Sequence, residues 1–190
     1  FTLMPAFVHE QAKKKLARAP RPDHRERWEA EALMMKTRLE QRIFGGFPRG
    51  VDWKVEPAEK SEGQDTREET FILYPEPGMP VPGVLVRGKD RQGPLPTAVL
   101  VDPAGKDAVL ESHLAHELVG AGWQVLAIDL RATGETALKS ETVRDAIDHN
   151  STEWAIWMGR PLLGQWCWDV MRAIDYLVTR DDVDARNLAL

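Results

Sequence analysis

The stretch from Thr97 to Arg131, TAVLVDPAGKDAVLESHLAHELVGAGWQVLAIDLR, decides the fold class of this chain. Its first five residues form a short apolar run, as expected for a strand that is buried on both faces of a sheet. Apolar residues at helical spacing predict a helix over 108–121, with Asp107 as its N-cap and Gly122 just past its end. A second apolar run over 123–128 predicts another buried strand. This order predicts a right-handed crossover between two parallel strands.

The flanking sequence extends this unit in both directions. Upstream, two β-forming runs, 69–74 and 81–87, enclose the turn-forming residues 75–78, which predicts an antiparallel hairpin. Downstream, an apolar face predicts a helix over 164–179, and a further strand begins at Asn187. The residues of that face are Cys167, Val170, Met171, Ile174, Leu177 and Val178. The predicted class is therefore α/β, with an antiparallel hairpin that leads into a parallel βαβαβ sheet.

The last predicted strand has a consequence for the whole protein. Leu188 and Leu190 would lie on an unclosed sheet if nothing covered them, and an open edge of this kind pairs readily with other chains. We therefore expect the remainder of the same domain, or a complementing partner, to be required.

Composition and charge exclude several classes of protein. The 190 residues are 43% hydrophobic, carry a net charge of -5 and include one cysteine, Cys167. No apolar run reaches the roughly 18 residues of a membrane-spanning helix. A lone cysteine excludes an internal disulfide framework and a cysteine-rich zinc site. The acidic balance argues against a nucleic-acid partner. Because the chain begins with Phe1, a removed export signal and a truncation both stay open, and with them a periplasmic, secreted or cytoplasmic location.

Residues 1–50 differ from the rest because they hold 11 Lys and Arg against 6 Asp and Glu. Apolar residues within 24–43 recur at helical spacing and predict an amphipathic helix that ends at Gly45 (Trp28, Ala32, Met35, Leu39 and Ile43). We interpret the basic run 13–18 as a solvated helix face, because no aromatic residues interleave. We predict an N-terminal helical extension over 1–50 and an incomplete α/β domain over 51–190.

Two loops are candidates for a functional site, because open α/β sheets bind ligands at the carboxyl ends of their strands. After the first strand, Ala104 and Gly105 are small enough to present backbone N–H groups to a developing oxyanion. A plain strand-to-helix turn is the alternative, since no phosphate-binding glycine motif is complete there. After the second strand, Arg131 lies close to Gly134 and Glu135. Its guanidinium could brace the loops or bind an anionic substrate, and bracing is the commoner outcome.

Other chemistry-bearing residues have plainer interpretations. His113 and His116 are three apart on the predicted helix, but no zinc-binding pattern accompanies them. The thiol of Cys167 is expected in the core. Four tryptophans fall close together, at positions 154, 157, 166 and 168; we expect most of them to pack in the core, with Trp154 or Trp157 as candidates for a pocket wall.

The order of these segments resembles the α/β-hydrolase superfamily, and most closely its acetyl xylan esterase and cephalosporin-C deacetylase-like branch. The resemblance is carried by the glycine loop at 102–105, by Asp129-Leu-Arg-x-x-Gly-Glu-Thr136, by Ile174-Asp-Tyr-Leu177 and by the run 182–190. It implies a serine esterase without cofactor or metal that acts on a small-molecule or carbohydrate ester. Its nucleophile would lie in Gly-x-Ser-x-Gly directly after the strand that starts at Asn187, followed by Asp or Glu and by His. None of the four serines, Ser61, Ser112, Ser140 and Ser151, has this pattern, so the resemblance places the catalytic triad beyond Leu190 and implies that this chain alone is inactive.

Two departures from the family leave alternatives open. Such esterases often have His-Gly in the first loop, where this chain has Asp102-Pro-Ala-Gly105, and often Arg-Gly-x-Gly in the second, where it has Arg131-Ala-Thr-Gly134. A non-catalytic binding protein with the same fold is therefore an alternative, and a nucleotide-binding doubly wound domain is a weaker one. The oligomeric state stays open.

Overall fold

The computed structural model describes residues 3–18, 21–138 and 149–190, and it divides into two compact units, Phe1–Leu39 and Glu40–Leu190. The first unit holds helix α1 (Leu3–Arg18) and most of helix α2 (Arg25–Arg42). Two ion pairs support α2, and each joins residues that are one helical turn apart: Arg25 with Glu29, and Arg27 with Glu31. The helix predicted over 24–43 is confirmed. In the described part of the chain, no helix is long and apolar enough to span a membrane.

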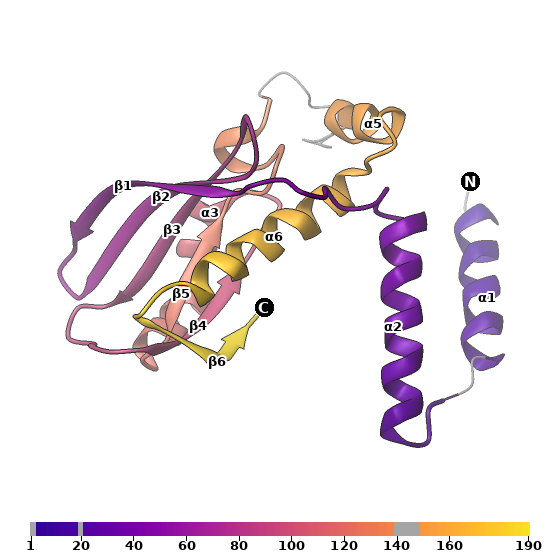
Figure 1. Ribbon diagram of the computed structural model, residues 1–190, viewed down its shortest axis with the longest axis horizontal. Helices are drawn as coiled ribbons and strands as arrows, with labels where there is room; N and C mark the ends of the chain where they lie inside the picture. Colours follow the sequence, from indigo (N-terminus) through magenta and orange to yellow (C-terminus); the bar gives the residue numbers. More distant parts are fainter. Residues whose placement is uncertain (1–2, 19–20, 139–148) are drawn as a thin grey trace. The chain divides into compact units, whose positions relative to one another are not determined.

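The second unit is built on one six-stranded sheet in the order β1-β2-β3-β5-β4-β6 (Figure 1). β1 (Lys54–Glu62), β2 (Thr66–Glu76), β3 (Met79–Gly88) and β5 (Gln124–Ile128) are joined by antiparallel pairing. β4 (Leu95–Leu100) runs parallel to β5 on one side and to β6 (Val183–Ala189) on the other. The α/β class, the hairpin and the three parallel strands predicted from the sequence are all confirmed.

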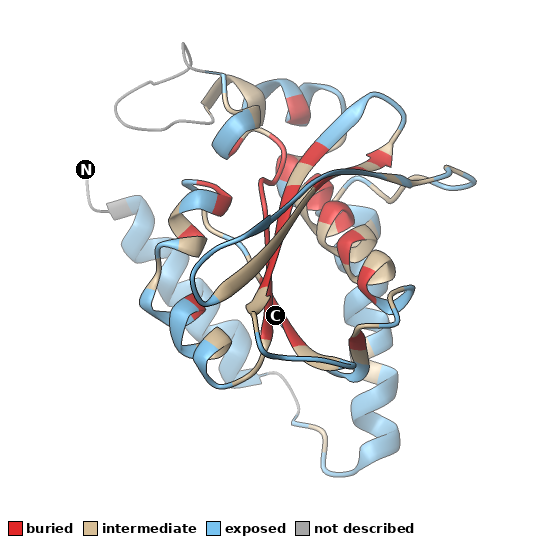
Figure 2. Ribbon diagram, turned by 90° about the vertical axis from the view of Figure 1, so that its left-hand side faces the viewer, coloured by how far each residue is buried: buried red, intermediate tan, exposed pale blue. Residues whose placement is uncertain are grey.

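Helices cover both faces of this sheet. α6 (Leu162–Val178) packs on one face of the sheet. Every second residue of a strand points to this face, and Phe71, Leu85 and Leu126 form a buried cluster there with Ala173 and Leu177 of α6. α3 (Lys106–Leu110) and α4 (His113–Gly120) cover the other face over β3 and β5. α5 (His149–Trp157) precedes α6. The buried segments gather in the central strands and along α6 (Figure 2).

Several details of the sequence prediction need correction. The helix predicted over 108–121 is two helices, because the Ser112 hydroxyl accepts the Ala115 N–H at 3.2 Å and starts a new helix. Asp107 is therefore not the N-cap and lies in the first turn of α3. The turn-forming residues at 75–76 belong to β2, which carries a bulge there. β1 and α5 were not predicted, and β6 begins at Val183 rather than Asn187.

β6 forms one edge of the described sheet, since it pairs only with β4 among these strands. Most of its residues are exposed, Leu188 packs partly against the core, and Leu190 is 77% exposed. This edge is the open one that the sequence led us to expect. The domain division predicted at residue 50 stays a prediction.

Candidate active-site loops

The two candidate loops follow β4 and β5 and lie at the same end of the sheet, beyond the carboxyl ends of these strands, because the strands are parallel neighbours. The carboxyl end of β6 lies at this end of the sheet too, since β6 runs parallel to β4. The β2–β3 turn also reaches it, because Gly83 of β3 pairs with Ile128 at the end of β5. The topology therefore brings together the loops after β4 and β5, the β2–β3 turn and the carboxyl end of β6, and open α/β sheets bind ligands at the carboxyl ends of their strands.

Asp129 joins the first loop to the second. It is the residue directly after β5 and is fully buried. Its carboxylate accepts the Lys106 N–H at 2.6 Å and the Glu135 N–H at 3.0 Å, and the Lys106 Nζ lies 3.2 Å away. Lys106 also donates to Glu135, so one buried amine and one buried carboxylate fasten both loops. Burial lowers the pKa of this amine, but the bonds to Glu135 and Asp129 outweigh that effect and raise it well above its usual value.

Two glycines allow this close approach. A Cβ on Gly105 would lie 2.5 Å from the Gly134 Cα and 2.6 Å from the Asp129 carboxylate. A Cβ on Gly134 would lie 2.0 Å from the same carboxylate. Both residues have positive φ, 101° and 50°. The predicted site residues Gly105 and Gly134 therefore lie against each other, and no side chain fits between them.

The backbone amides predicted for an oxyanion hole are already engaged within their loop. The Ala104 N–H donates to the Asp102 carboxylate at 2.8 Å, and the Gly105 N–H donates to the Asp102 carbonyl oxygen at 2.9 Å. Such local side-chain bonds stabilise a turn. In this arrangement the two amides point into the loop, and their oxyanion role stays a prediction that requires Asp102 to release them.

Arg131 is held by partners on two other elements, β2 and α6. Its Nε donates to Asp169 at 3.0 Å and its Nη1 donates to Gln165 at 3.0 Å. Its Nη2 lies 2.7 Å from Glu76 and 2.8 Å from Asp169, as ion-pair contacts without hydrogen-bond geometry. With a side chain only 8% exposed, the guanidinium faces its protein partners and braces the loop after β5 against β2 and α6.

The Arg131 partners form a buried ionic cluster, which we define as Glu76, Arg131, Arg160, Gln165 and Asp169. Arg160 binds Glu76 through two parallel bonds of 2.9 and 2.8 Å. Burial works against the charge of Glu76, but the bonds from Arg160 and the nearby positive charge of Arg131 hold its pKa below the usual value. Burial raises the pKa of Asp169 to about 7, although Arg131 acts to lower it. The Asp169 Oδ2 has no hydrogen-bond partner among the described residues. The cluster therefore holds one carboxyl group with a lowered pKa and one with a raised pKa.

The loop after β5 contains one further unusual residue. Ala132 has φ 62° and is the only non-glycine residue with positive φ in the part of the chain that the structure describes. The left-handed region costs a residue with a Cβ about 1–2 kcal/mol. A glycine would adopt this conformation without that cost.

The solved structures that this chain resembles include esterases. A candidate acetyl xylan esterase from Bacteroides fragilis is 15% identical and gives a TM-score of 0.74, over 90% of this chain and 48% of that one. A glucuronoyl esterase from Solibacter usitatus is 14% identical with a TM-score of 0.59, over 86% and 52%. An acetyl xylan esterase from Thermoanaerobacterium sp. is 18% identical with a TM-score of 0.55, over 74% and 44%.

The fold is that of an α/β-hydrolase. The resemblance to acetyl xylan esterases is thereby confirmed for the fold, and these identities show the fold alone. The chain spans about half the length of the esterase structures that it matches. No protein-family profile and no curated protein matches the sequence.

Other residues singled out in the sequence are the four tryptophans and Cys167. Trp166 donates to the Arg131 carbonyl at 2.7 Å and Trp168 to the Pro75 carbonyl at 3.1 Å, so both are packing residues. Trp154 and Trp157 are 48% and 75% exposed on α5. Cys167 is half-buried, and burial raises the pKa of its thiol.

The two histidines singled out in the sequence make contacts within α4 and its N-cap. His113 contacts Glu117, and His116 contacts the Ser112 carbonyl. Within the described ranges no three His, Cys, Asp or Glu side chains gather as a metal site. Ser61 lies on β1, Ser112 caps α4 and Ser151 lies in α5. Ser140 lies outside the described residues.

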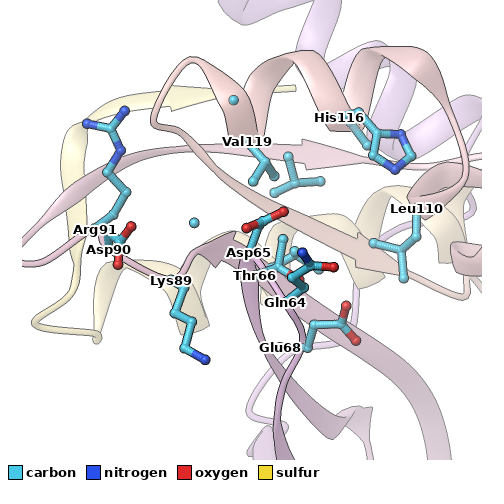
Figure 3. A pocket seen from close by; sticks show the side chains of 15 residues that line it. Gln64, Asp65, Thr66, Glu68, Lys89, Asp90, Arg91, Leu110, His116 and Val119 are labelled. Carbon is cyan, nitrogen blue, oxygen red and sulfur yellow. The ribbon is translucent and has the colours of Figure 1, made fainter.

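A cavity of about 490 Å³ lies elsewhere, between the ends of β2 and β3 and helix α4 (Figure 3). Val86, Val119 and Val125 line it, and polar side chains such as Asp65 and His116 surround them. Val125 stands at the amino-terminal half of β5, whereas the loops follow its carboxyl end. This cavity therefore lies at the opposite end of the strands from the candidate site.

Sequence reasoning missed the residues that fix the loops. The sequence prediction assigns no role to Asp129 and Lys106, and it places Glu76 in a turn. Asp169 lies in a helix for which the sequence predicts only that the apolar face is buried. One signal is present: an Asp directly after the apolar run that ends at Ile128 is expected to be buried, and a buried carboxylate requires nearby donors.

Proposed function

We propose that this chain supplies the first half of the α/β-hydrolase domain of a serine-type carboxylic-ester hydrolase that acts on carbohydrate acetyl esters. The observation that carries the proposal is the position of β6. It runs parallel to β4, and its carboxyl end lies at the same end of the sheet as the loops after β4 and β5. A nucleophile on the turn after β6 would stand directly beside the loop of Ala104 and Gly105.

The residues of this chain then have supporting roles in acyl transfer. Asp129 and Lys106 fix the distance between the two loops, and the ionic cluster fixes the second loop on α6. Release of Asp102 would let the Ala104 and Gly105 amides face a tetrahedral intermediate, where such donors lower the barrier. The chain following Leu190 would supply the serine, the base and the carboxylate that orients the base. The known activities of the structural neighbours as esterases agree with this chemistry.

Hydrolysis of p-nitrophenyl acetate tests the proposal. We expect no hydrolysis by residues 1–190 and measurable hydrolysis by a chain that continues past Leu190, because only the longer chain has a nucleophile. Ser61→Ala in the longer chain is the matched control and should keep full activity, since Ser61 lies on β1. Equal rates for the short and the long chains would refute the proposal.

One observation favours a second candidate, a non-catalytic binding protein. The amides of Ala104 and Gly105 are both occupied by Asp102, and an occupied oxyanion hole cannot stabilise an intermediate. The sequence after Leu190 separates the two candidates, because Gly-x-Ser-x-Gly supports the esterase and a missing serine supports the binding protein. A binding protein would show a raised melting temperature with an acetylated xylo-oligosaccharide and no release of acetate.

A further inference from the structure

Helix α2 carries an apolar stripe that the proposed function does not use. We define the stripe as Trp28, Ala32, Met35 and Leu39, whose spacings of 4, 3 and 4 place them on one side of the helix. Trp28 is 60% exposed, Met35 63% and Leu39 38%. A row of large exposed apolar side chains on one helix marks an interaction surface.

Charged residues border the stripe in a regular pattern. At 100° per residue, Glu29 and Lys36 lie along one border, and Glu31 and Arg38 lie along the other. On each border the acidic residue precedes the basic one by seven residues, or about two helical turns. Glu29 and Glu31 each bind an arginine of their own helix through one oxygen, which leaves the other carboxylate oxygen free to accept. Lys36 and Arg38 have no ion pair among the described residues.

This pattern is complementary to itself when a second α2 lies antiparallel against the first. Trp28 then faces Leu39 of the second copy and Ala32 faces its Met35, so that large and small side chains alternate. In the same register, Glu29 meets Lys36 and Glu31 meets Arg38 of the second copy. Twofold symmetry repeats each contact, which gives four ion pairs around a continuous apolar seam.

The opposite orientation fits less well. In a parallel pair, Glu31 would meet Lys36 of the second copy, but Arg38 would face Ile43. The antiparallel contact cannot extend beyond the stripe, because the next pair of facing residues at each end would be Arg25 and Arg42, which repel each other. The seam is therefore short, and the association it supports depends on concentration.

We infer that the chain self-associates through the α2 stripe as an antiparallel pair of helices, related by a twofold axis. This inference goes beyond the proposed function and does not depend on it. The charge pattern favours a second copy of this chain as the binding partner. On each border, the acidic residue of one copy meets the basic residue of the same border on the other copy.

Sedimentation equilibrium of the longer chain that continues past Leu190, unchanged and with two charge reversals, tests the inference. We expect a monomer–dimer equilibrium for the unchanged chain. Glu31→Arg and Arg38→Glu should each weaken the dimer about tenfold, because each converts two attractive contacts into two repulsive ones. An equimolar mixture of the two variants should restore association, since each variant then meets the opposite charge at both contacts.

Controls separate this geometry from general charge effects and from loss of helix. Glu26→Arg makes the same change of charge on the far side of α2 and should not alter the equilibrium. Mixed with Arg38→Glu, it should not restore association. Circular dichroism should show unchanged helix content in every variant.

Three outcomes would overturn the inference. The first is a chain that stays monomeric at every concentration at which it remains in solution, which would mean that its own body covers the stripe. The second is a dimer that is indifferent to all α2 reversals, as pairing through the edge of β6 would be. The third is a mixture of the two variants that associates no better than either variant alone.

Discussion

Gly105 shows how one residue sets the geometry of the candidate site. Its missing side chain lets the first loop touch Gly134 and the buried Asp129 carboxylate, and its φ of 101° turns the chain into α3. Asp129 can accept from both loops only because the loops approach this closely. Ala132 also has a positive φ, 62°, which its Cβ makes unfavourable.

Gly105→Ala should lower the free energy of unfolding by about 3 kcal/mol, because it adds both a strained φ and a clash. Gly78→Ala separates the two effects, since Gly78 has φ 75° and open space around its Cα. It should cost about 1 kcal/mol. Gly120→Ala, at the end of α4 with open space and no positive φ, should be neutral or slightly stabilising. Urea unfolding measures all three, and a cost for Gly105→Ala no greater than that for Gly78→Ala would disprove the close approach.

At the scale of elements, the ionic cluster fastens α6 to the loop after β5 and to the end of β2. Breaking such a buried cluster from one side is costly, because it leaves a charge without its partner. Asp169 is the least well satisfied residue of the cluster, since it is fully buried and only one of its two oxygens accepts hydrogen bonds. The attachment of α6 therefore depends on the charge of one carboxyl group.

The pH dependence of stability should report this carboxyl group. Its pKa of about 7 in the folded chain is above the usual value of 3.8, so the folded state binds the proton more tightly. The resulting stability is fully present below about pH 4 and is lost as the pH rises through 7. Relative to Asp169→Asn, which cannot ionise, the unchanged chain should lose stability on the order of 4 kcal/mol between pH 4 and pH 7.

The matched control for this prediction is Asp175→Asn. Asp175 lies on the same helix but is 43% exposed in its pair with Arg172. Its replacement should leave the pH profile of unfolding unchanged. Profiles of Asp169→Asn and the unchanged chain that run parallel from pH 4 to pH 7 would contradict the buried, proton-binding carboxyl.

The elements also show what the sequence can and cannot predict. β4 and β5 were predictable because short apolar runs between turn residues have few other uses in an α/β chain. β1 was missed because KVEPAEKSE has neither apolar alternation nor a β-rich composition, and it is an exposed edge strand that depends on β2. The break between α3 and α4 was missed because Ser112 competes for the Ala115 amide only once the chain has turned.

The site residues follow the same division. The sequence located the loops of Ala104, Gly105, Arg131, Gly134 and Glu135, because chain order alone places loops at strand ends. It did not show that Arg131 reaches Asp169, 38 residues later, or Glu76, 55 residues earlier, since these contacts depend on how α6 crosses the sheet. Long-range ionic partners of this kind leave no local pattern.

At the scale of the whole molecule, the central claim is that the described sheet is part of an esterase domain whose nucleophile follows β6. The fold of the structural neighbours, the parallel β6 and the position of the loops at the same end of the sheet all support it. The claim concerns a position in space as well as an activity, so a reagent that marks the nucleophile tests it more directly than a rate does.

Covalent labelling of the longer protein with a fluorophosphonate, followed by peptide mapping, is that test. Fluorophosphonates react with activated serines, so the label reports where the nucleophile lies. We predict a single labelled serine on the turn immediately after β6, and no label on Ser61, Ser112 or Ser151. A protein that hydrolyses esters while its label lies on one of those three serines, or far from the turn after Leu190, would contradict the account.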